Sequence, residues 1–413
     1  MDERAAAFAR LFQAVHEGVY IGTIGADVTT TLERGRQLAA LGNCAACHTA
    51  PGGTPGAGGR AFDTPFGTVL STNLTPDVAT GIGAWSFSAF QRAMREGVSR
   101  DGHRLYPAFP YTAFTRIGDD DLMALYAHLM AQPAIANAVP ESRLAFPFSV
   151  RPLLALWNAL HLEPGPRTPE PSTSAQWQRG EFLVNGPGHC GACHTPRDAL
   201  GAERTGTALL SGARIEGWWA PSLTTVGARG LPWTESSLYA YLRRGWSPHH
   251  GAAAGPMAEV VASLQGAPDD DLRAMAHYLA SFQPAATDTA VQAQADARRA
   301  QALADAPPPD AMQRFFESAC GACHAEGRAP VELGQNIPLA LSSKLRADKP
   351  DNLLRVLMDG IREPATRELG FMPAFRHSVD DRQVAELAAW LRRRHAPDLP
   401  AWSGLAEAVA AAR

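Results

Sequence analysis

The sequence predicts an all-α protein built as three tandem domains joined by proline-rich linkers. Its length of 413 residues corresponds to two to four compact units, at about 100–200 residues per domain. With 37 Gly and 32 Pro, the chain favours short helices joined by loops over a long-helix bundle. One short motif also occurs three times, and similar segments follow each copy, which is the mark of an internal repeat.

The composition excludes several classes of function. Lys and Arg total 37 against 41 Asp and Glu, a formal charge of −4, so the chain has no basic field for a nucleic acid. Hydrophobic residues make up 46% of the chain, enough for sizeable cores. No apolar run approaches the ~18 residues of a membrane-spanning helix. We therefore expect a globular protein that is at most peripheral to a membrane.

All six cysteines lie in three copies of the pattern C-x-x-C-H. The copies are Cys44 and Cys47 with His48, Cys190 and Cys193 with His194, and Cys320 and Cys323 with His324. This pattern is the attachment signature of c-type haem. The two thiols form thioethers to the porphyrin, and the adjacent imidazole becomes the proximal ligand of the iron.

Two other sites also use C-x-x-C, namely a thioredoxin-like dithiol and half of a zinc site. A single C-x-x-C-H would leave both interpretations open. Three copies that each carry the histidine, and that together use every cysteine, favour three covalently bound haem c groups.

A helix with a defined start and end is expected after each motif. Ser86 and Thr234 are suited to cap the first two of these helices, which should end at Gly97 and Gly245. The third, from Asn352, should end at Gly360, where a glycine can take a left-handed conformation. These three glycines give a common reference point for the repeats.

The residue twelve positions after each of these glycines is a candidate iron ligand. In order, the three residues are Phe109, Met257 and Met372. Small class I cytochromes c generally supply a thioether sulfur from an irregular loop at this point. A methionine can instead fill an apolar core. Because Pro256 and Pro373 adjoin the two methionines and argue against a helix interior, ligation is favoured.

Each loop should be followed by a final helix with an acidic start, where carboxylates suit the helix dipole. These starts are Asp119, Asp269 and Asp380. The apolar face of the helix should pack on the first helix of its repeat. His128, which lies on this helix, is interpreted as a packing group and not as a ligand.

The repeats predict the domain boundaries. We expect an N-terminal extension over residues 1–28, domains over 29–135, 173–284 and 311–396, linkers over 136–172 and 285–310, and a C-terminal tail over 397–413. The second linker is rich in Ala, Gln and Asp and ends in three prolines, which favours a semi-rigid spacer.

In this order the motifs resemble those of the three-haem cytochrome c subunits of membrane-associated bacterial dehydrogenases, which oxidise alcohols, gluconate, fructose or aldehydes. The segments that carry the resemblance are Cys44–Gly53, Pro65–Thr68, Asn73–Asp77, Gly81–Gly83, Cys190–Arg197 and Gly255–Val261. The resemblance implies class I cytochrome c domains that relay electrons from a catalytic dehydrogenase subunit to ubiquinone or a terminal oxidase. It also implies a periplasmic location, peripheral on the inner membrane.

A weaker resemblance concerns the type of catalytic partner. Phe109, together with the segments Met372–Arg376 and Leu399–Leu405, is similar to cytochrome subunits paired with molybdopterin dehydrogenases of aldehydes or N-heterocycles. Flavin and quinoprotein partners stay open. No nucleotide-binding loop, flavin motif or Ser/His/Asp arrangement is present, so we expect no catalytic residue in this chain.

Phe109 departs from the family pattern, in which many members have methionine. Phenylalanine cannot ligate iron, so the first haem is either five-coordinate, ligated by another group such as His103, or reached by Met94 after a rearrangement. His103 is the leading substitute because it lies on the same loop, and an ordinary exposed histidine is the competing interpretation. Loss of the methionine predicts a lower potential for this haem.

Two alternatives to a relay subunit follow. An open first haem would suit a haem enzyme or a protein that binds small ligands, and a free periplasmic shuttle would have no fixed partner. The start of the sequence, from Met1, leads into no apolar export core, so export needs either a signal upstream or a partner. Residues 5–20 are expected to form a short amphipathic helix.

Overall fold

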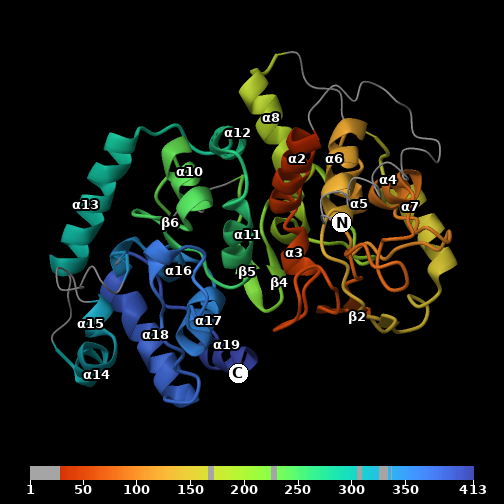
Figure 1. Ribbon diagram of the computed structural model, residues 1–413. Helices are drawn as coiled ribbons and strands as arrows, with labels where there is room; N and C mark the ends of the chain where they lie inside the picture. Colours follow the sequence, from red (N-terminus) through yellow and green to blue (C-terminus); the bar gives the residue numbers. More distant parts are fainter. Residues whose placement is uncertain (1–27, 166–171, 225–229, 305–308, 325–333, 336) are drawn as a thin grey trace. The chain divides into compact units, whose positions relative to one another are not determined.

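The computed structural model describes residues 28–165, 172–224, 230–304, 309–324, 334–335 and 337–413 (Figure 1). The amphipathic helix expected over residues 5–20, and the N-terminal extension up to residue 27, lie outside this range. The chain separates into two compact units. One comprises the described residues up to Ala192 with Arg197–Arg204 and Ser263–Asp271, and the other comprises Cys193–Pro196, Thr205–Ala262 and Leu272–Arg413.

The first unit is mainly helical, with one small sheet. Its elements are α2 (Val28–Leu41), α3 (Cys44–Cys47), β1 (Ala61–Thr64), β2 (Gly67–Leu70), α4 (Phe87–Glu96), α5 (Tyr111–Phe114), α6 (Asp119–Met130), β3 (Arg143–Leu144), the 3-10 turn η1 (Arg151–Leu153), α7 (Leu154–His161) and α8 (Ala175–Asn185). The short helix α9 (Gly191–His194) lies where the chain passes into the second unit.

Helices α2 and α6 cross in close contact, as expected for the first and last helices of a repeat (Figure 1). Gly35 of α2 makes this approach possible, because an added Cβ would clash with the backbone carbonyl of Ala124 in α6. Beside the crossing, the Arg34 guanidinium binds both oxygens of Asp121, at 2.8 and 2.9 Å. Such two-pronged pairs fix geometry more strongly than single contacts.

The same two-pronged pair of an arginine and an aspartate occurs in the second repeat. Arg179 of α8 binds both oxygens of Asp271, again at 2.8 and 2.9 Å, and Asp271 lies in the first turn of α12 (Asp269–Ala280). Gly180 follows Arg179 as Gly35 follows Arg34, and it is buried. The repeat inferred from the sequence therefore extends to the pairing of its first and last helices.

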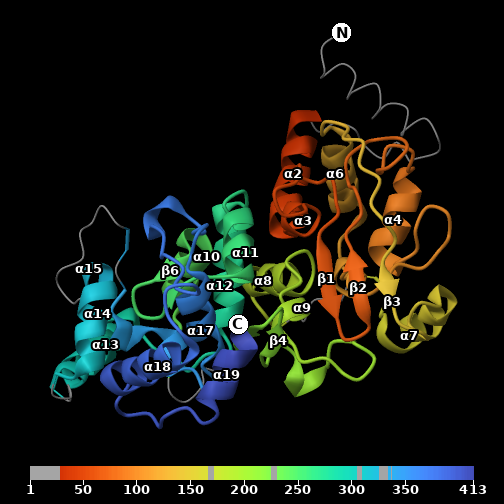
Figure 2. The same cartoon turned by 90° about the horizontal axis from the view of Figure 1, so that it is seen from below.

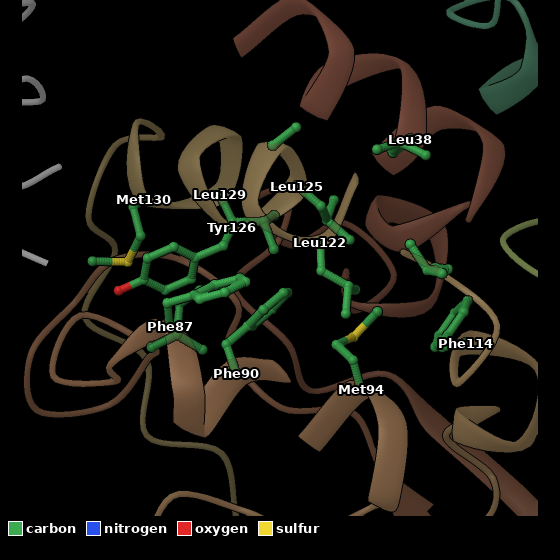
Figure 3. Close-up of a cluster of buried hydrophobic side chains, with 13 residues drawn as sticks. Leu38, Phe87, Phe90, Met94, Phe114, Leu122, Leu125, Tyr126, Leu129 and Met130 are labelled. Atoms are coloured by element: carbon green, nitrogen blue, oxygen red, sulfur yellow. The ribbon is translucent and has the colours of Figure 1, made fainter. Parts of the chain in front are cut away.

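A core of aromatic and aliphatic side chains fills the first unit between α2, α4 and α6 (Figure 3). Tyr126 is 1% exposed and contacts Phe87 and Phe90 at ring-centroid distances of 5.8 and 5.4 Å. Its hydroxyl donates to the backbone carbonyl of Trp85, which satisfies the one polar atom of the ring. This core packs α2, α4 and α6 against one another.

The second unit contains the remaining elements. They are η2 (Gly206–Ala208), β4 (Ala213–Ile215), β5 (Trp218–Ala220), α10 (Glu235–Arg244), β6 (Trp246–Ser247), β7 (Gly251–Ala252), α11 (Pro256–Leu264), α12, α13 (Asp288–Ala304), α14 (Ala311–Ala319), α15 (Gly321–His324), η4 (Leu339–Leu341), α16 (Ser343–Arg346), α17 (Asp351–Asp359), η5 (Arg367–Leu369), α18 (Asp381–His395) and α19 (Leu405–Ala412). The ends of α11 and α12 nearest each other belong to the first unit.

The predicted helix signals are confirmed at most ends. Ser86 accepts from the backbone N–H of Ala89, and Thr234 forms a capping box with Ser237. The helices α4 and α10 stop at Gly97 and Gly245, both left-handed with φ of 65° and 77°. The start of α6 differs, because Gly118 is its cap residue and the acidic side chains lie in the first turn instead.

The expectation of an all-α protein is confirmed only in its main feature. The described residues are mainly helical, but they also form three small antiparallel sheets, ordered β1-β2-β3, β4-β5 and β6-β7. Each strand has two to four residues. Strands this short carry no alternating pattern that a sequence could reveal.

Segments expected to be linkers and tail also contain helices. The first linker holds α7 (Figure 2), the second holds α13, and the tail holds α19, which packs on α17 and α18. Within the second unit, Val291 and Ala295 of α13 are buried against Leu231 and Leu341. The second linker is therefore a packed helix over much of its length, and not only a spacer.

Candidate haem-binding sites

The first C-x-x-C-H motif forms the one-turn helix α3, followed by His48. The Nδ1 atom of His48 lies 2.6 Å from the backbone carbonyl oxygen of Thr72. The backbone of the motif is held as well, because the N–H of Gly58 donates to the carbonyl of His48 at 2.7 Å, and Arg60 donates to that of Ala46 at 2.8 Å. These bonds fix both the ring and the turn that carries the thiols.

The second motif repeats this arrangement. Nδ1 of His194 lies 2.7 Å from the carbonyl oxygen of Pro221, and the N–H of Gly212 donates to the carbonyl of His194 at 2.7 Å. Arg197 donates to the carbonyl of Ala192 at 2.8 Å, as Arg60 does to Ala46. Two motifs far apart in the chain thus share three equivalent hydrogen bonds.

The contact with a carbonyl decides which ring nitrogen is available to a metal. A carbonyl oxygen can only accept, so Nδ1 carries the proton and Nε2 of His48 and His194 presents a lone pair. Burial lowers the pKa of both histidines, which favours the neutral form that binds metals. A ligating histidine oriented in this way by its other nitrogen is usual in metal sites. The residues present therefore fit a proximal haem ligand.

The third motif forms α15 in the second unit. The Nδ1 atom of His324 is buried and has no hydrogen-bond partner among the described residues. Residues 325–333, which follow it, lie outside that range. Cys320 packs against a core cluster that includes Phe316, Leu357 and Trp390, and Met372 packs against the same cluster. The structure thus places Cys320, an expected attachment cysteine, and Met372, the expected distal ligand, against the same apolar cluster.

Burial affects the thiols of two of the six cysteines. Burial raises the pKa of Cys44 to about 12 and that of Cys320 to about 11. Among the described residues, no group of three or more His, Cys, Asp or Glu side chains could hold a metal ion. The part of the chain that the structure describes therefore contains no set of ligands for a zinc ion.

Met257 lies in the first turn of α11, directly after Pro256. The sequence predicted an irregular loop here, which is a wrong expectation for this residue. Proline at the first position of a helix costs nothing, because the N–H at that position has no partner in the helix. The Met257 side chain packs against a cluster of Ala253, Ala258 and Val261 in the second unit.

Met372 is held in an extended pairing with Ile361. Each residue donates its backbone N–H to the other's carbonyl, at 2.9 and 3.0 Å. Gly360, with φ of 71°, precedes this pair, and a Cβ there would clash with the carbonyl of Met372. The glycine that ends α17 is therefore required by the approach of the methionine loop.

Phe109 occupies the position that corresponds to Met257. In the first loop the N–H of Leu105 donates to the carbonyl of Gly97 at 2.7 Å, and in the second the N–H of Ala253 donates to Gly245 at the same distance. The Phe109 ring packs on the first core and lies 5.4 Å from that of Phe114. The phenylalanine thus lies on a loop with the same backbone contact.

The two substitutes for the missing methionine lie in different surroundings. His103 is 43% exposed on a turn, where its Nδ1 lies 2.6 Å from Asp101 and 3.0 Å from the hydroxyl of Ser99. Met94 is 6% exposed and lies in the core between Phe114 and Leu122 (Figure 3). Whether either residue ligates the first haem stays a prediction.

Residues downstream of the first and second loops also hold them, a feature that the sequence analysis missed. Arg151 donates to the carbonyl of Arg104 at 2.8 Å, and Lys344 donates to that of Ala252 at 2.6 Å. These two carbonyls lie seven residues after Gly97 and Gly245. No sequence signal marks the donors, because they come from unrelated segments.

The end of the preceding helix is supported in the same manner. Asn158 donates to the last carbonyl of α4, at Glu96, and Thr366 donates to the last carbonyl of α10, at Arg244. Both carbonyls would otherwise lack a partner inside the helix. The first and second ligand loops are therefore each braced at two points by the chain that follows them.

Family models match the chain in three places. A model described as "Cytochrome c" matches residues 32–133 and 178–283, and one described as "Cytochrome C oxidase, cbb3-type, subunit III" matches residues 307–391. Each matched range contains one C-x-x-C-H motif. Cytochrome c domains carry covalently attached haem c, in agreement with the geometry at His48 and His194.

Named relatives are similar over most of the chain. The cytochrome c subunit of the quinone-dependent alcohol dehydrogenase of Gluconobacter oxydans is 37% identical, over 88% of this chain and 78% of the relative. The cytochrome c subunit of the gluconate 2-dehydrogenase of Pantoea cypripedii is also 37% identical, over 87% of this chain and 85% of the relative. The chain belongs to the family of dehydrogenase cytochrome c subunits.

A third relative is more similar but much longer. It is a subunit of the nicotinate dehydrogenase of Pseudomonas putida and is 50% identical over 94% of this chain, which spans 32% of that protein's length. The predicted resemblance to dehydrogenase cytochrome subunits is thus confirmed at the level of the family.

Proposed function

We propose that this chain is a three-haem electron-transfer subunit of a periplasmic dehydrogenase complex, made of three tandem class I cytochrome c domains. It would pass electrons from a catalytic subunit to ubiquinone or a terminal oxidase. The observation that carries the proposal is the shared geometry of His48 and His194, whose Nδ1 atoms face backbone carbonyls at 2.6 and 2.7 Å. The C-x-x-C-H motif to which these two histidines belong occurs three times in the chain.

When bound, haem c supplies an iron that accepts and donates one electron. The residues of this chain would hold and tune that group. The cysteine pairs attach it, and His48, His194 and His324 provide the proximal nitrogen. Met257 and Met372 would provide the distal sulfur of the second and third sites, and the apolar core around Cys320 and Met372 would keep water away from the third.

The relatives support a proposal for the type of catalytic partner. Members of the family are named for the oxidation of alcohols, gluconate and nicotinate. The higher identity to the nicotinate dehydrogenase relative supports a partner that oxidises an N-heterocycle or an aldehyde, of the molybdopterin type. A flavin or quinoprotein partner is the alternative that the alcohol and gluconate relatives support.

The experiment is to purify the protein from native membranes under mild conditions and to assay it for haem, molybdenum and flavin. We expect three haems per chain by pyridine haemochrome assay, together with a large catalytic subunit that contains molybdenum. Flavin without molybdenum would reassign the partner but keep the relay. Purification without any second subunit would contradict the proposal and favour a free shuttle.

A second function is favoured by one observation. Phe109 takes the sequence position that Met257 takes in the second loop, so this position offers the first haem no thioether. An open iron would bind a small ligand such as carbon monoxide. If so, carbon monoxide should shift the Soret band of the reduced protein by the share of one haem. A full His/Met spectrum for all three haems would exclude this role.

A further inference from the structure

In the first unit, the turn that leads into the first motif contacts the turn that leads into the second. The Nε2 atom of His189, the residue directly before Cys190, lies 3.1 Å from the backbone carbonyl oxygen of Gly42. Gly42 lies two residues before Cys44. A carbonyl oxygen only accepts, so Nε2 carries the proton and donates it. We call this hydrogen bond between His189 and Gly42 the junction.

The two backbones also approach each other closely at the junction. A Cβ added to Gly42 would lie 3.4 Å from the sulfur of Cys44 and 3.5 Å from the carbonyl oxygen of Pro187. A side chain at position 42 would therefore crowd both the thiol of the first motif and the turn before the second. The absence of a side chain at Gly42 is what allows the two turns to meet.

Both turns hold a residue other than glycine in the left-handed conformation. Asn43, directly before Cys44, has a φ of 50°, and His189 has a φ of 36°. Asn and His enter this region more often than most residues, but the conformation costs free energy and persists only where surrounding contacts impose it. The corresponding residue of the third motif, Ala319, is instead the last residue of helix α14. The first two motifs therefore share a strained turn that the third lacks.

The His189 ring also contacts the side chains behind the first ligand loop. Its centroid lies 5.4 Å from that of Phe114, at an interplanar angle of 79°. Phe114 is 5% exposed, belongs to the core shown in Figure 3, and contacts Phe109 at the same centroid distance. A series of ring contacts thus leads from Phe109, through Phe114, to His189 and the adjacent Cys190.

Further contacts hold the first and second repeats together within the first unit. The hydroxyl of Ser263 donates to the carbonyl of Ala40 at 2.9 Å, and Arg116 pairs with Glu181 at 3.2 Å. All four residues belong to the first unit. Replacement of His189 alone should therefore leave the two repeats associated and change only the contact that lies nearest the cysteines in the sequence.

We propose that His189 is a positioning residue for electron transfer between the first and second haems. The proposal deepens the proposed function and rests on it. The rate of electron transfer falls steeply with the distance between donor and acceptor, and the junction fixes the attachment turns relative to each other. One iron would lose the electron that the other gains. His189 would form no bond to either group, and the proton would stay on its Nε2 atom.

The residues at the two ligand positions set the direction of transfer. Met257 would raise the potential of the second haem, whereas Phe109 offers the first haem no thioether. The electron would therefore pass from the first haem to the second, across the junction that His189 holds.

The experiment is flash photoreduction of the purified haem protein with less than one equivalent of a soluble photoreductant. Reoxidation of the first haem is followed by absorption, as a phase whose rate does not depend on protein concentration. His189→Gly keeps the left-handed turn but removes the ring and its hydrogen bond. It should slow this phase about fivefold to tenfold, the factor that the loss of one hydrogen bond makes in an equilibrium.

Three further variants test whether the effect belongs to the junction. His189→Gln keeps a side-chain N–H that can reach the carbonyl of Gly42, so it should restore most of the native rate. His189→Asn tolerates the left-handed turn but has a shorter amide, so it should be slow like His189→Gly. The matched control is Asn43→Gly, which changes the equivalent turn before Cys44 without removing the hydrogen bond and should react as the native protein does.

Spectroelectrochemical titration of the same variants shows whether the driving force has changed, and we expect native potentials in all of them. An unchanged rate in both His189→Gly and His189→Asn, or an equal loss in Asn43→Gly, would overturn the proposal. If the haems are reduced by the catalytic subunit but the rate ignores His189, only the role of His189 fails. If the protein has no redox-active haem, the relay itself fails.

Discussion

The first and second ligand loops have the same scaffold but differ at the residue that would meet the iron. Both are closed by a 2.7 Å backbone bond to the glycine that ends the preceding helix, and both are braced by a cation and by a polar side chain from downstream. One then presents Phe109 and the other Met257. The loop conformation is therefore maintained by bonds within the protein. The residue at the ligand position can change while that conformation stays the same.

Removal of one pair of attachment cysteines should have the largest effect. Replacing Cys190 and Cys193 with Ala should remove one haem in three and about half of the far-red absorption band that arises from methionine bound to ferric iron. Replacing Cys44 and Cys47 should remove one haem and leave the band intact. Haem content and ferric spectra measure both. A loss of the band in the Cys44 and Cys47 variant would show that the first haem is ligated by methionine.

Exchange of the loop residues should have the next largest effect. Met257→Phe should lower the potential of the second haem on the order of 100 mV, because methionine ligation raises the potential. Phe109→Met should raise that of the first and strengthen the far-red band. Spectroelectrochemical titration measures the potentials. If Phe109→Met changes neither the band nor any potential, the two loops are not equivalent.

The two cations that brace the loops should differ in their response to pH. Burial lowers the pKa of Lys344 to about 8 from an ordinary value of 10.5. Between these values the unfolded chain binds more protons than the folded protein, so Lys344 makes stability rise with pH. Lys344→Met should remove about 2 kcal/mol of that rise. Arg151→Met should not, because arginine stays charged throughout.

Chemical denaturation at pH 7.5 and pH 10 measures this difference. The native protein and the Arg151→Met variant should show the same change between the two values, whereas the Lys344→Met variant should show a smaller gain. An identical pH response in all three proteins would mean that the ammonium of Lys344 is solvated like an ordinary surface lysine.

The smallest expected effect concerns the bond at the end of α10. Thr366→Val keeps the shape of the side chain but removes the hydroxyl that donates to the carbonyl of Arg244, at a cost of about 1 kcal/mol. Asn158→Leu removes two such bonds in the first unit and should cost more. Urea denaturation compares the two. Equal losses of stability in the two variants would show that the first loop depends no more than the second loop on the segment downstream of it.

Local signals in the sequence predicted much of the fold, because capping and helix termination depend on a few adjacent residues. Ser86, Thr234, Gly97 and Gly245 act as expected. The helices between the repeats were not predicted. Helix α13 is Ala- and Gln-rich and is held by distant contacts, such as the bond from Arg298 to the carbonyl of Gly230. Contacts of this kind leave no periodic trace in the sequence.

The candidate sites likewise contain residues that the sequence could reveal and residues that it could not. The cysteines and histidines could be identified because the chemistry of attachment requires them in one short pattern. The carbonyls of Thr72 and Pro221, which orient the two histidines, could not, because any residue has a backbone carbonyl. Arg151 and Lys344 are equivalent in role but come from different elements, so only the fold shows their correspondence.

The central claim is that this chain relays electrons for a separate dehydrogenase. The most direct test is to add the substrate of the copurified catalytic subunit to the intact complex, without oxygen, and to follow the haem absorption. Reduction of the haems at the rate of substrate oxidation, and their reoxidation by a soluble ubiquinone analogue, is the predicted result. Haems that stay oxidised while the substrate is consumed would contradict the account.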